Sequence, residues 1–279
     1  MTPILEVDRL SVSYGRTPAV RSASLQLGRG EVLGLVGESG SGKTTLSMAI
    51  LGLLPASAQT AGAIRFQGED LTKLGPRRIR ALRGEKIALI MQNPASALDP
   101  AHTIGRQFIE LFRAHGRSSR RAALAAAELW LTRVGIADPK ERLRSFPHQL
   151  SGGMNQRVMI ALALALDPML LIADEPTSAL DVTVQAQILR ILRTLIETFD
   201  GASVVVSHDL GVIAQLATKV AVMYRGDIVE QAPVQQLFKA PQHDYTKHLL
   251  ASLPARREHR EPLDGSAGAM TMPIGQGDH

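Results

Sequence analysis

The stretch Gly-Glu-Ser-Gly-Ser-Gly-Lys-Thr at residues 37–44 has the complete pattern of a phosphate-binding loop. It follows the apolar run Val-Leu-Gly-Leu-Val at residues 32–36, which is typical of a buried strand. It precedes the run Thr-Leu-Ser-Met-Ala-Ile-Leu at residues 45–51, which is typical of a helix start. This strand–loop–helix order is the context that the motif requires, and it argues against a glycine-rich turn without chemical meaning. The stretch therefore predicts a site for a nucleoside triphosphate.

The residue types of this loop are those that phosphate binding needs. Glycines let the backbone wrap closely around an anion with its N–H groups pointing inward, and the following helix presents the positive end of its dipole. Lys43 can reach the β- and γ-phosphates, and Thr44 can offer its hydroxyl to Mg²⁺. The loop residues expected to contact ATP are Gly37, Glu38, Ser39, Gly40, Ser41, Gly42, Lys43, Thr44 and Thr45.

Composition narrows the class of protein. The 279 residues allow one large or two modest domains, and a hydrophobic content of 45% suffices for a sizeable core. No run of about 18 uncharged apolar residues occurs, and the first residues lack the layout of a secretion signal. The absence of cysteine excludes disulfides and thiolate metal sites and suits the cytosol. The net charge is +5, but aromatics are only 4% and the basic clusters are scattered, so no nucleic-acid binding is expected.

The pattern along the chain predicts an α/β fold. From residue 152 onward, predicted strands alternate with predicted helices, which favours a mostly parallel sheet. The helical block at 103–147 contains no strand pattern and is interpreted as an insertion into the nucleotide-binding core. Residues 255–279 are rich in charge, Gly and Pro and are expected to be a disordered tail. The predicted strands are 4–7, 10–14, 23–27, 31–36, 63–66, 86–91, 169–173, 202–207, 219–224 and 227–230, and the clearest later helices are 152–166, 183–198 and 210–216.

A second half of the site is expected from carboxylates at a strand end. The apolar strand at 169–173 ends in Asp174 and Glu175. A carboxylate at such a position can hold Mg²⁺, and the next one is placed to polarise water for attack on the γ-phosphate. An apolar run followed by Asp-Glu is on its own no more than an ordinary strand end, and the phosphate-binding loop gives it meaning.

Three further side chains have both a functional and a plain structural interpretation. His208 follows the strand at 202–207, at the edge where ligands bind in α/β sheets, and it either contacts the γ-phosphate or faces solvent. Gln92 either contacts Mg²⁺ and the attacking water or simply ends the strand at 86–91. Tyr14 either stacks on adenine or packs within its strand.

The run Leu-Ser-Gly-Gly-Met-Asn-Gln at residues 150–156 is the motif most characteristic of one protein family. Alone, Ser-Gly-Gly at a helix start is a helix cap with backbone freedom. Together with the other motifs it resembles the ATP-binding cassette (ABC) family over residues 4–254. The motifs that carry this resemblance, in chain order, are 37–44, Gln92, 150–156, 170–175, Ser-Ala-Leu-Asp at 178–181, and His208.

The ABC resemblance implies a fold, a dimer and an activity. The fold is a P-loop NTPase core with an antiparallel β subdomain and an inserted helical subdomain. We expect one nucleotide-binding domain at 1–254, with the insertion at about 93–152. The family forms head-to-tail dimers that enclose two ATP molecules. The Ser151, Gly152 and Gly153 turn of one subunit would then face the phosphate-binding loop of the other, and Asp181 would communicate across the dimer. Met154 departs from the family, which commonly has Gln there.

The resemblance also assigns roles. Glu175, His208 and Gln92 are the expected catalytic residues for hydrolysis of ATP to ADP and phosphate. Thr44, Gln92 and Asp174 are the expected Mg²⁺ ligands. The expected partners are a second ATPase subunit, the same or a related chain, and two integral membrane permease subunits, with a periplasmic or extracellular solute-binding protein acting indirectly. The expected location is peripheral, on the cytoplasmic face of the cell membrane.

A closer resemblance is to the importer ATPases for peptides, nickel and metal–chelator complexes. This resemblance implies an ATP-hydrolysing subunit that powers import of nickel, a metal–chelator complex or a di- or oligopeptide. Peptide-transporting members often carry a cysteine cluster after the C-terminal helix; this chain has none, which favours nickel or a metallophore over a peptide as cargo. The segments that carry this closer resemblance are 92–100, 148–154, 173–187 and 243–254.

Other kinds of cassette ATPase fit less well. DNA-repair and chromosome-type ATPases need long coiled coils, for which the block at 103–147 is too short. Translation-type proteins normally carry two cassettes, and this chain carries one. A nucleotide sensor without catalysis, or a soluble ATPase without a transport role, remains the alternative, although an intact catalytic set argues against a sensor.

Overall fold

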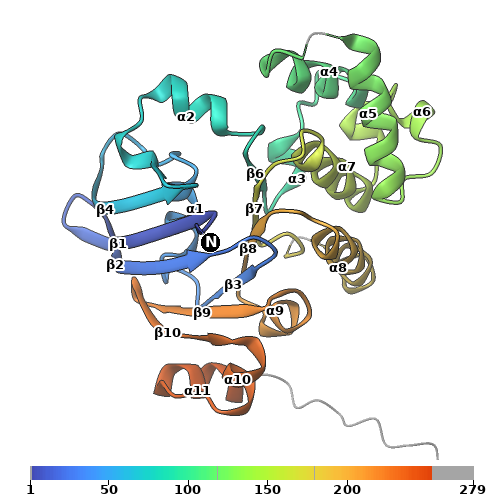
Figure 1. The fold of residues 1–279 in the computed structure, drawn as a ribbon. Coiled ribbons are helices and arrows are strands. Elements are labelled where there is room, and N and C mark those ends of the chain that lie inside the picture. Colours follow the sequence, from blue (N-terminus) through green and yellow to red (C-terminus); the bar gives the residue numbers. More distant parts are fainter. Residues whose placement is uncertain (1, 118, 179, 253–279) are drawn as a thin grey trace, which may run out of the picture.

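The computed structural model describes residues 2–117, 119–178 and 180–252. The tail predicted at 255–279 lies outside these residues. Figure 1 shows three layers, with an antiparallel sheet and helix α1 on one side of a central sheet and helices α7, α8 and α9 on the other. The sequence-based prediction of an α/β fold with an antiparallel β subdomain and a helical insertion is confirmed.

The antiparallel sheet has four strands in the order β2-β1-β4-β5. Strand β1 joins the two segments predicted at 4–7 and 10–14, because a bulge at Arg9, where φ is 45°, shifts the register instead of ending the strand. The strands are β1 (Leu5–Tyr14), β2 (Thr17–Leu27), β4 (Ala58–Phe66) and β5 (Glu69–Asp70).

The central sheet has six strands in the order β10-β9-β3-β8-β7-β6, and only β10 runs antiparallel to its neighbour. Both faces of β3, β7 and β8 are covered, which explains their unbroken apolar sequence. The parallel strands all end at one edge, where the predicted site residues follow them. The strands are β3 (Val32–Val36), β6 (Ile87–Ile90), β7 (Leu170–Asp174), β8 (Ala202–Ser207), β9 (Lys219–Tyr224) and β10 (Asp227–Pro233).

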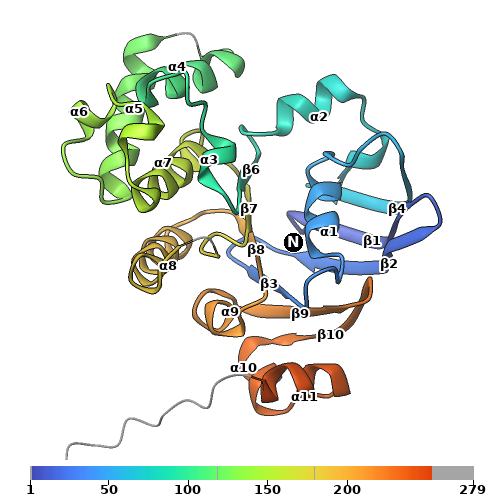
Figure 2. The ribbon, with the colours of Figure 1, turned by 180° about the vertical axis from the view of Figure 1, so that it is seen from behind.

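Helix α1 (Lys43–Ile50) lies between the two sheets, as Figure 2 shows from behind. Leu46 and Ile50 of this helix are fully buried with Leu5 of β1 and Leu33 of β3 in one core. Burying aliphatic side chains of this size contributes roughly 1.5–3 kcal/mol each. The start of α1 is therefore fixed against the strand that precedes the phosphate-binding loop.

The helical insertion forms a separate block above the central sheet (Figure 1). Its two longest helices begin with side-chain caps: Thr103 accepts from the N–H of Arg106, and Ser119 from that of Ala122. Gly105 permits a close approach, since a Cβ there would lie 2.8 Å from the carbonyl oxygen of Leu143. The helices of this block are α3 (Pro94–Ala97), α4 (Ile104–Ala114), α5 (Arg120–Arg133) and α6 (Pro139–Arg142).

The remaining helices pack around the two sheets (Figure 1). Helix α2 was not among the predicted helices, because its basic sequence was interpreted only as a charged cluster. These helices are α2 (Pro76–Leu82), α7 (Gly152–Leu164), α8 (Val182–Glu197), α9 (Leu210–Leu216), α10 (Val234–Lys239) and α11 (Asp244–Ala251), with short 3₁₀ turns at Leu71–Lys73 and Pro147–Gln149.

Candidate nucleotide site

The phosphate-binding loop connects β3 to α1 and approaches neighbouring backbone closely. Gly42 has φ of 108°, and a Cβ there would lie 2.3 Å from the carbonyl oxygen of Ala19. Gly37 has φ of 154°, and a Cβ there would lie 2.1 Å from the carbonyl oxygen of Met223. Only glycine fits at these two positions, so the glycines that the sequence pattern requires are also dictated by packing.

Lys43 lies within the loop that it serves. Its ammonium group donates to the carbonyl oxygens of Gly37 at 2.7 Å and Glu38 at 2.8 Å, and the residue is 6% exposed. Burial lowers the pKa of Lys43, while the nearby carboxylates of Glu175, Asp174 and Glu38 oppose that shift. A buried ammonium group in this position offers a strong electrostatic contact to an anion.

A cavity of about 300 Å³ joins the two halves of the site. The loop contributes one wall, and the ends of strands β6 and β7 contribute the other. Folding therefore brings together the phosphate-binding loop and the carboxylates that lie far from it in sequence, as predicted. The lining residues are Ala19, Ser39, Gly40, Gly42, Lys43, Thr44, Thr45, Gln92, Asp174 and Glu175.

Asp174 is buried and only partly satisfied. It is 9% exposed, and its Oδ1 has no hydrogen-bond partner in the part of the chain that the structure describes. The pKa of Asp174 is raised overall, chiefly by burial and also by the nearby Glu175 carboxylate. The Thr44 hydroxyl and the Lys43 ammonium group act in the opposite direction and lower this pKa. A buried carboxylate oxygen without a donor, beside a hydroxyl and an amide, is the oxygen-rich environment that Mg²⁺ prefers. The residues present therefore fit the ion.

Glu175 is held between two of the predicted residues. Its carboxylate accepts from Gln92 Nε2 at 3.3 Å and lies 3.1 Å from His208 Nδ1. Its backbone adopts φ of 46°, a conformation that is uncommon outside glycine and asparagine and is found disproportionately at functional sites. The side chain is 21% exposed, at the edge of the cavity. A carboxylate fixed in this way can accept a proton from a water molecule placed beside it.

The Ser151–Gly153 turn does not reach this cavity within one chain. Ser151 instead caps α7 by accepting from the N–H of Met154 at 3.3 Å, and both Ser151 and Gly152 are exposed. Asp181 caps α8, accepting from the N–H of Val184 at 3.0 Å. A Cβ at Gly153 would lie 2.7 Å from a methyl group of Val184, so the two helix starts pack directly on each other.

Tyr14 also lies outside the cavity lining. It ends β1 opposite Thr17 and is 37% exposed. The structure thus shows an accessible ring, and the expected stacking on adenine stays a prediction.

Two contacts at the loop were missed by sequence reasoning. Ala19 of β2 lines the cavity and supports Gly42 from behind. The hydroxyl of Tyr245 in α11 accepts from the backbone N–H of Glu38 at 2.9 Å. Neither position carries a local sequence signal, because each contact joins segments that are distant along the chain.

Comparison with known proteins matches residues 20–178 to the ABC transporter family. The chain belongs to this family. Residues 229–275 also match the oligopeptide/dipeptide transporter C-terminal region, a segment that extends beyond the described residues. As a family member, the chain is an ATP-binding protein and an ATPase whose hydrolysis is coupled to transport, and the predicted family and activity are confirmed.

Individual relatives cover most of the chain. It is 50% identical over 88% of its length to the "Probable peptide ABC transporter ATP-binding protein y4tR" of Sinorhizobium fredii, covering 74% of that protein. It is 44% identical over 98% of its length to the dipeptide transport ATP-binding protein DppD of Bacillus subtilis, covering 84% of that protein.

A solved structure extends the likeness to three dimensions. A dimeric ATP-binding cassette in a post-hydrolysis state, bound to ADP and Pi, superposes with a TM-score of 0.69 at 25% identity. The alignment covers 82% of this chain and 98% of the other.

Within the described residues, no helix of this chain is both long and apolar enough to cross a bilayer.

Proposed function

We propose that this chain is the ATP-hydrolysing subunit of an importer for dipeptides or oligopeptides. The observation that supports the catalytic part is the Glu175 carboxylate, held by Gln92 and His208 at the rim of the cavity that Lys43 also lines. The observation that supports the cargo is the match of residues 229–275 to the C-terminal region of oligopeptide and dipeptide transporters.

The cargo proposal departs from what the sequence alone favoured. The lack of cysteine pointed to nickel or a metallophore, but the relatives reported above are named for peptides or dipeptides. The C-terminal match occurs in a chain with no cysteine, so the cysteine cluster is not required for that likeness. In the described parts of the chain, no three His, Cys, Asp or Glu side chains are grouped so that they could hold a metal ion.

In the proposed mechanism, the loop amides and Lys43 hold the β- and γ-phosphates. Thr44, Asp174 and Gln92 would hold Mg²⁺, which when bound supplies charge neutralisation for the phosphate oxygens. Glu175 accepts a proton from water as the water oxygen bonds to the γ-phosphorus. The bond from that phosphorus to the β-phosphate oxygen breaks, and the electron pair leaves with ADP. His208 and Gln92 orient the Glu175 carboxylate for this step.

We propose that the second half of each nucleotide site comes from another ATPase subunit. The N-terminus of α7 is an anion-binding end with an exposed serine, yet it lies away from the cavity of its own chain. Such an end can complete a phosphate site only in a neighbouring copy or a related chain. The dimeric form of the solved cassette bound to ADP and Pi supports this arrangement. The exposed Val182, 83% accessible beside Asp181, would lie near the same interface.

Replacing Ser151 with arginine tests the shared site. A long cation at this exposed turn would obstruct the neighbouring subunit, so ATP-dependent association is expected to disappear while the monomer stays folded. The measurement is size-exclusion chromatography of the hydrolysis-deficient Glu175→Gln chain with Mg-ATP, alone and mixed with its partner ATPase. Ser119→Arg is the matched control, because Ser119 caps α5 in the same way. ATP-driven dimers of Ser151→Arg would show that the interface lies elsewhere.

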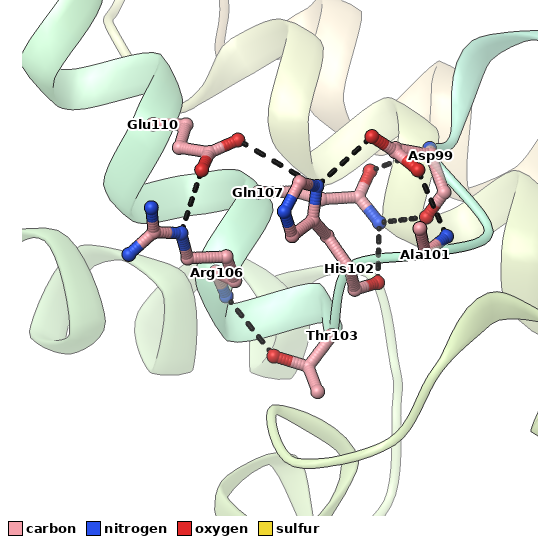
Figure 3. Close-up of polar contacts among 7 residues, drawn as sticks. All are labelled: Asp99, Ala101, His102, Thr103, Arg106, Gln107 and Glu110. Atoms are coloured by element: carbon pink, nitrogen blue, oxygen red, sulfur yellow. Dashed lines mark hydrogen bonds and ion pairs between the residues drawn. The ribbon is translucent and has the colours of Figure 1, made fainter.

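The segment between Gln92 and α4 is suited to transmit closure to membrane partners. Figure 3 shows that the Gln107 side chain bridges the backbone of this segment, accepting from Asp99 N and donating to the carbonyl oxygens of Asp99 and His102. His102 also contacts Asp99 Oδ2 at 2.9 Å. A loop stiffened in this way would move as one body with the helical block when Gln92 responds to nucleotide.

We propose that the segment between Gln92 and α4, with the helical block, contacts two permease subunits. A solute-binding protein would act through those permeases. The chain would then sit peripherally on the cytoplasmic face of the cell membrane. A soluble ATPase or a nucleotide sensor is the remaining alternative, and it predicts no integral membrane proteins in the purified assembly.

Transport by the reconstituted complex tests the function. Dipeptide, nickel and a nickel–chelator complex are offered as competing cargoes, with uptake and phosphate release measured together. The proposal predicts ATP-dependent uptake of peptide that excess nickel does not displace. Uptake of nickel or the nickel–chelator complex without uptake of peptide would overturn the proposed cargo. If the chain releases phosphate at a normal rate but associates with no permease, the proposed transport role would be wrong.

A further inference from the structure

The C-terminal helix α11 contacts the phosphate-binding loop through a residue that does not line the cavity. The Tyr245 hydroxyl accepts a hydrogen bond from the N–H of Glu38 at 2.9 Å. The Tyr245 ring stacks on Tyr224, the last residue of β9, with centroids 4.1 Å apart and planes inclined by 27°. Stacking of this kind fixes the ring, and with it the direction of the hydroxyl.

The start of α11 is itself anchored to the central sheet. The carboxylate of Glu230 in β10 accepts from the N–H groups of Gln242 and His243, each at 2.9 Å. Burial raises the pKa of Glu230, but the neighbouring Thr246 hydroxyl, these two amides and His243 lower it overall. The carboxylate is therefore ionised at neutral pH and holds the first turn of α11 in place.

The loop also rests on the turn after β9. The N–H of Gly226 donates to the carbonyl oxygen of Ser41 at 2.9 Å, and Gly37 packs against the carbonyl oxygen of Met223. Strand β9 and helix α11 thus form one support beneath the loop, and the stack of Tyr224 and Tyr245 joins its two parts.

The hydrogen bond from Glu38 has a specific consequence for Lys43. The N–H of Glu38 and the carbonyl of Gly37 belong to the same planar peptide group. Tyr245 binds the N–H end, and the Lys43 ammonium binds the carbonyl end at 2.7 Å. Rotation of this peptide group would break both contacts together. Hydrogen bonds at opposite ends of one amide also polarise and strengthen each other.

We infer that Tyr245 is a positioning residue for ATP: it orients the Gly37–Glu38 peptide group and through it the Lys43 ammonium, and so couples the C-terminal region to nucleotide affinity. The inference rests on the proposed role of Lys43 as the phosphate contact. According to this inference, helix α11 contributes to nucleotide affinity although it does not line the cavity.

Tyr245→Phe is the direct test, since it removes the hydroxyl and keeps the stacked ring. Net loss of one neutral hydrogen bond corresponds to about a five-fold effect. We expect the KM for Mg-ATP of the purified transporter to rise about five-fold, with kcat within two-fold of wild type, because saturating nucleotide restores the loop. The measurements are phosphate release across ATP concentrations and thermal unfolding of each variant.

Tyr224→Phe is the matched control. Its hydroxyl makes no hydrogen bond with any residue that the structure describes, so it removes a hydroxyl from the same stack without touching the loop. An unchanged KM in Tyr245→Phe, or an equal rise in Tyr224→Phe, would overturn the inference. A fall in kcat at constant KM would do the same.

Repeating the Tyr245→Phe substitution in a chain that also carries Lys43→Ala separates this inference from the proposed function. In Lys43→Ala, the effect of Tyr245→Phe on nucleotide affinity, measured by calorimetry, should vanish, because the group to be positioned is gone. Persistence of the five-fold effect there would contradict the coupling to Lys43. If Lys43→Ala alone left affinity unchanged, the proposed role of Lys43 would fail instead.

Discussion

Replacing Glu175 with glutamine is expected to slow ATP hydrolysis by about 10²-fold or more while nucleotide still binds. Glutamine keeps the size of the side chain and an oxygen that can accept from Gln92, but its amide does not take a proton from water. The cavity and the Lys43 contacts to the loop stay in place. Phosphate release measures the rate, and calorimetry with Mg-ATP measures the affinity.

Glu197→Gln is the control for this change. Glu197 pairs with Arg193 at 2.9 Å at the end of α8, with both side chains more than half exposed, so its neutralisation should leave turnover unchanged. Normal phosphate release by Glu175→Gln would remove Glu175 from the mechanism. A loss of nucleotide affinity equal to the loss of rate would show that the residue binds ATP instead of activating water.

Replacing Lys43 with alanine is expected to weaken ATP binding by about 30-fold, the size of one to two charge-assisted hydrogen bonds to phosphate. The change also removes the only ammonium group that lines the described cavity and leaves Asp174 and Glu175 without their neighbouring cation. Their mutual repulsion would add to the cost of bringing a triphosphate into the site.

The dissociation constant for Mg-ATP, measured by calorimetry on the full chain, tests this change. Lys239→Ala serves as a control, since Lys239 is exposed at the end of α10. Unaltered affinity in Lys43→Ala would mean that the loop binds the phosphates through its backbone alone.

Local sequence patterns predicted the secondary-structure elements around the candidate site well. The strand at 202–207 and the helix at 210–216 have the predicted bounds, and α1 begins at Lys43, two residues before the prediction. Gln92, Glu175 and His208 lie together because the parallel strands that precede them end at the same edge of the sheet. Such features depend on short apolar runs and on topology, which the sequence shows directly.

Other features depend on contacts that no local pattern shows. The bulge at Arg9 keeps β1 continuous where the apolar spacing breaks. Helix α2 begins with Pro76 at its first turn, a signal of a helix start that the basic sequence obscured. The hydrogen bond between Tyr245 and Glu38 joins residues separated by 207 positions. The part of the site that we propose comes from a second subunit needs two chains to be seen.

The structure of the assembled transporter in its Glu175→Gln form with bound Mg-ATP tests the shared nucleotide site most directly. The account predicts that each triphosphate touches Lys43, or its counterpart, on one ATPase subunit and the serine–glycine turn of the other, at residues 151–153 in this chain. Residues 151–153 facing bulk solvent, with no second ATPase subunit covering the triphosphate, would contradict it.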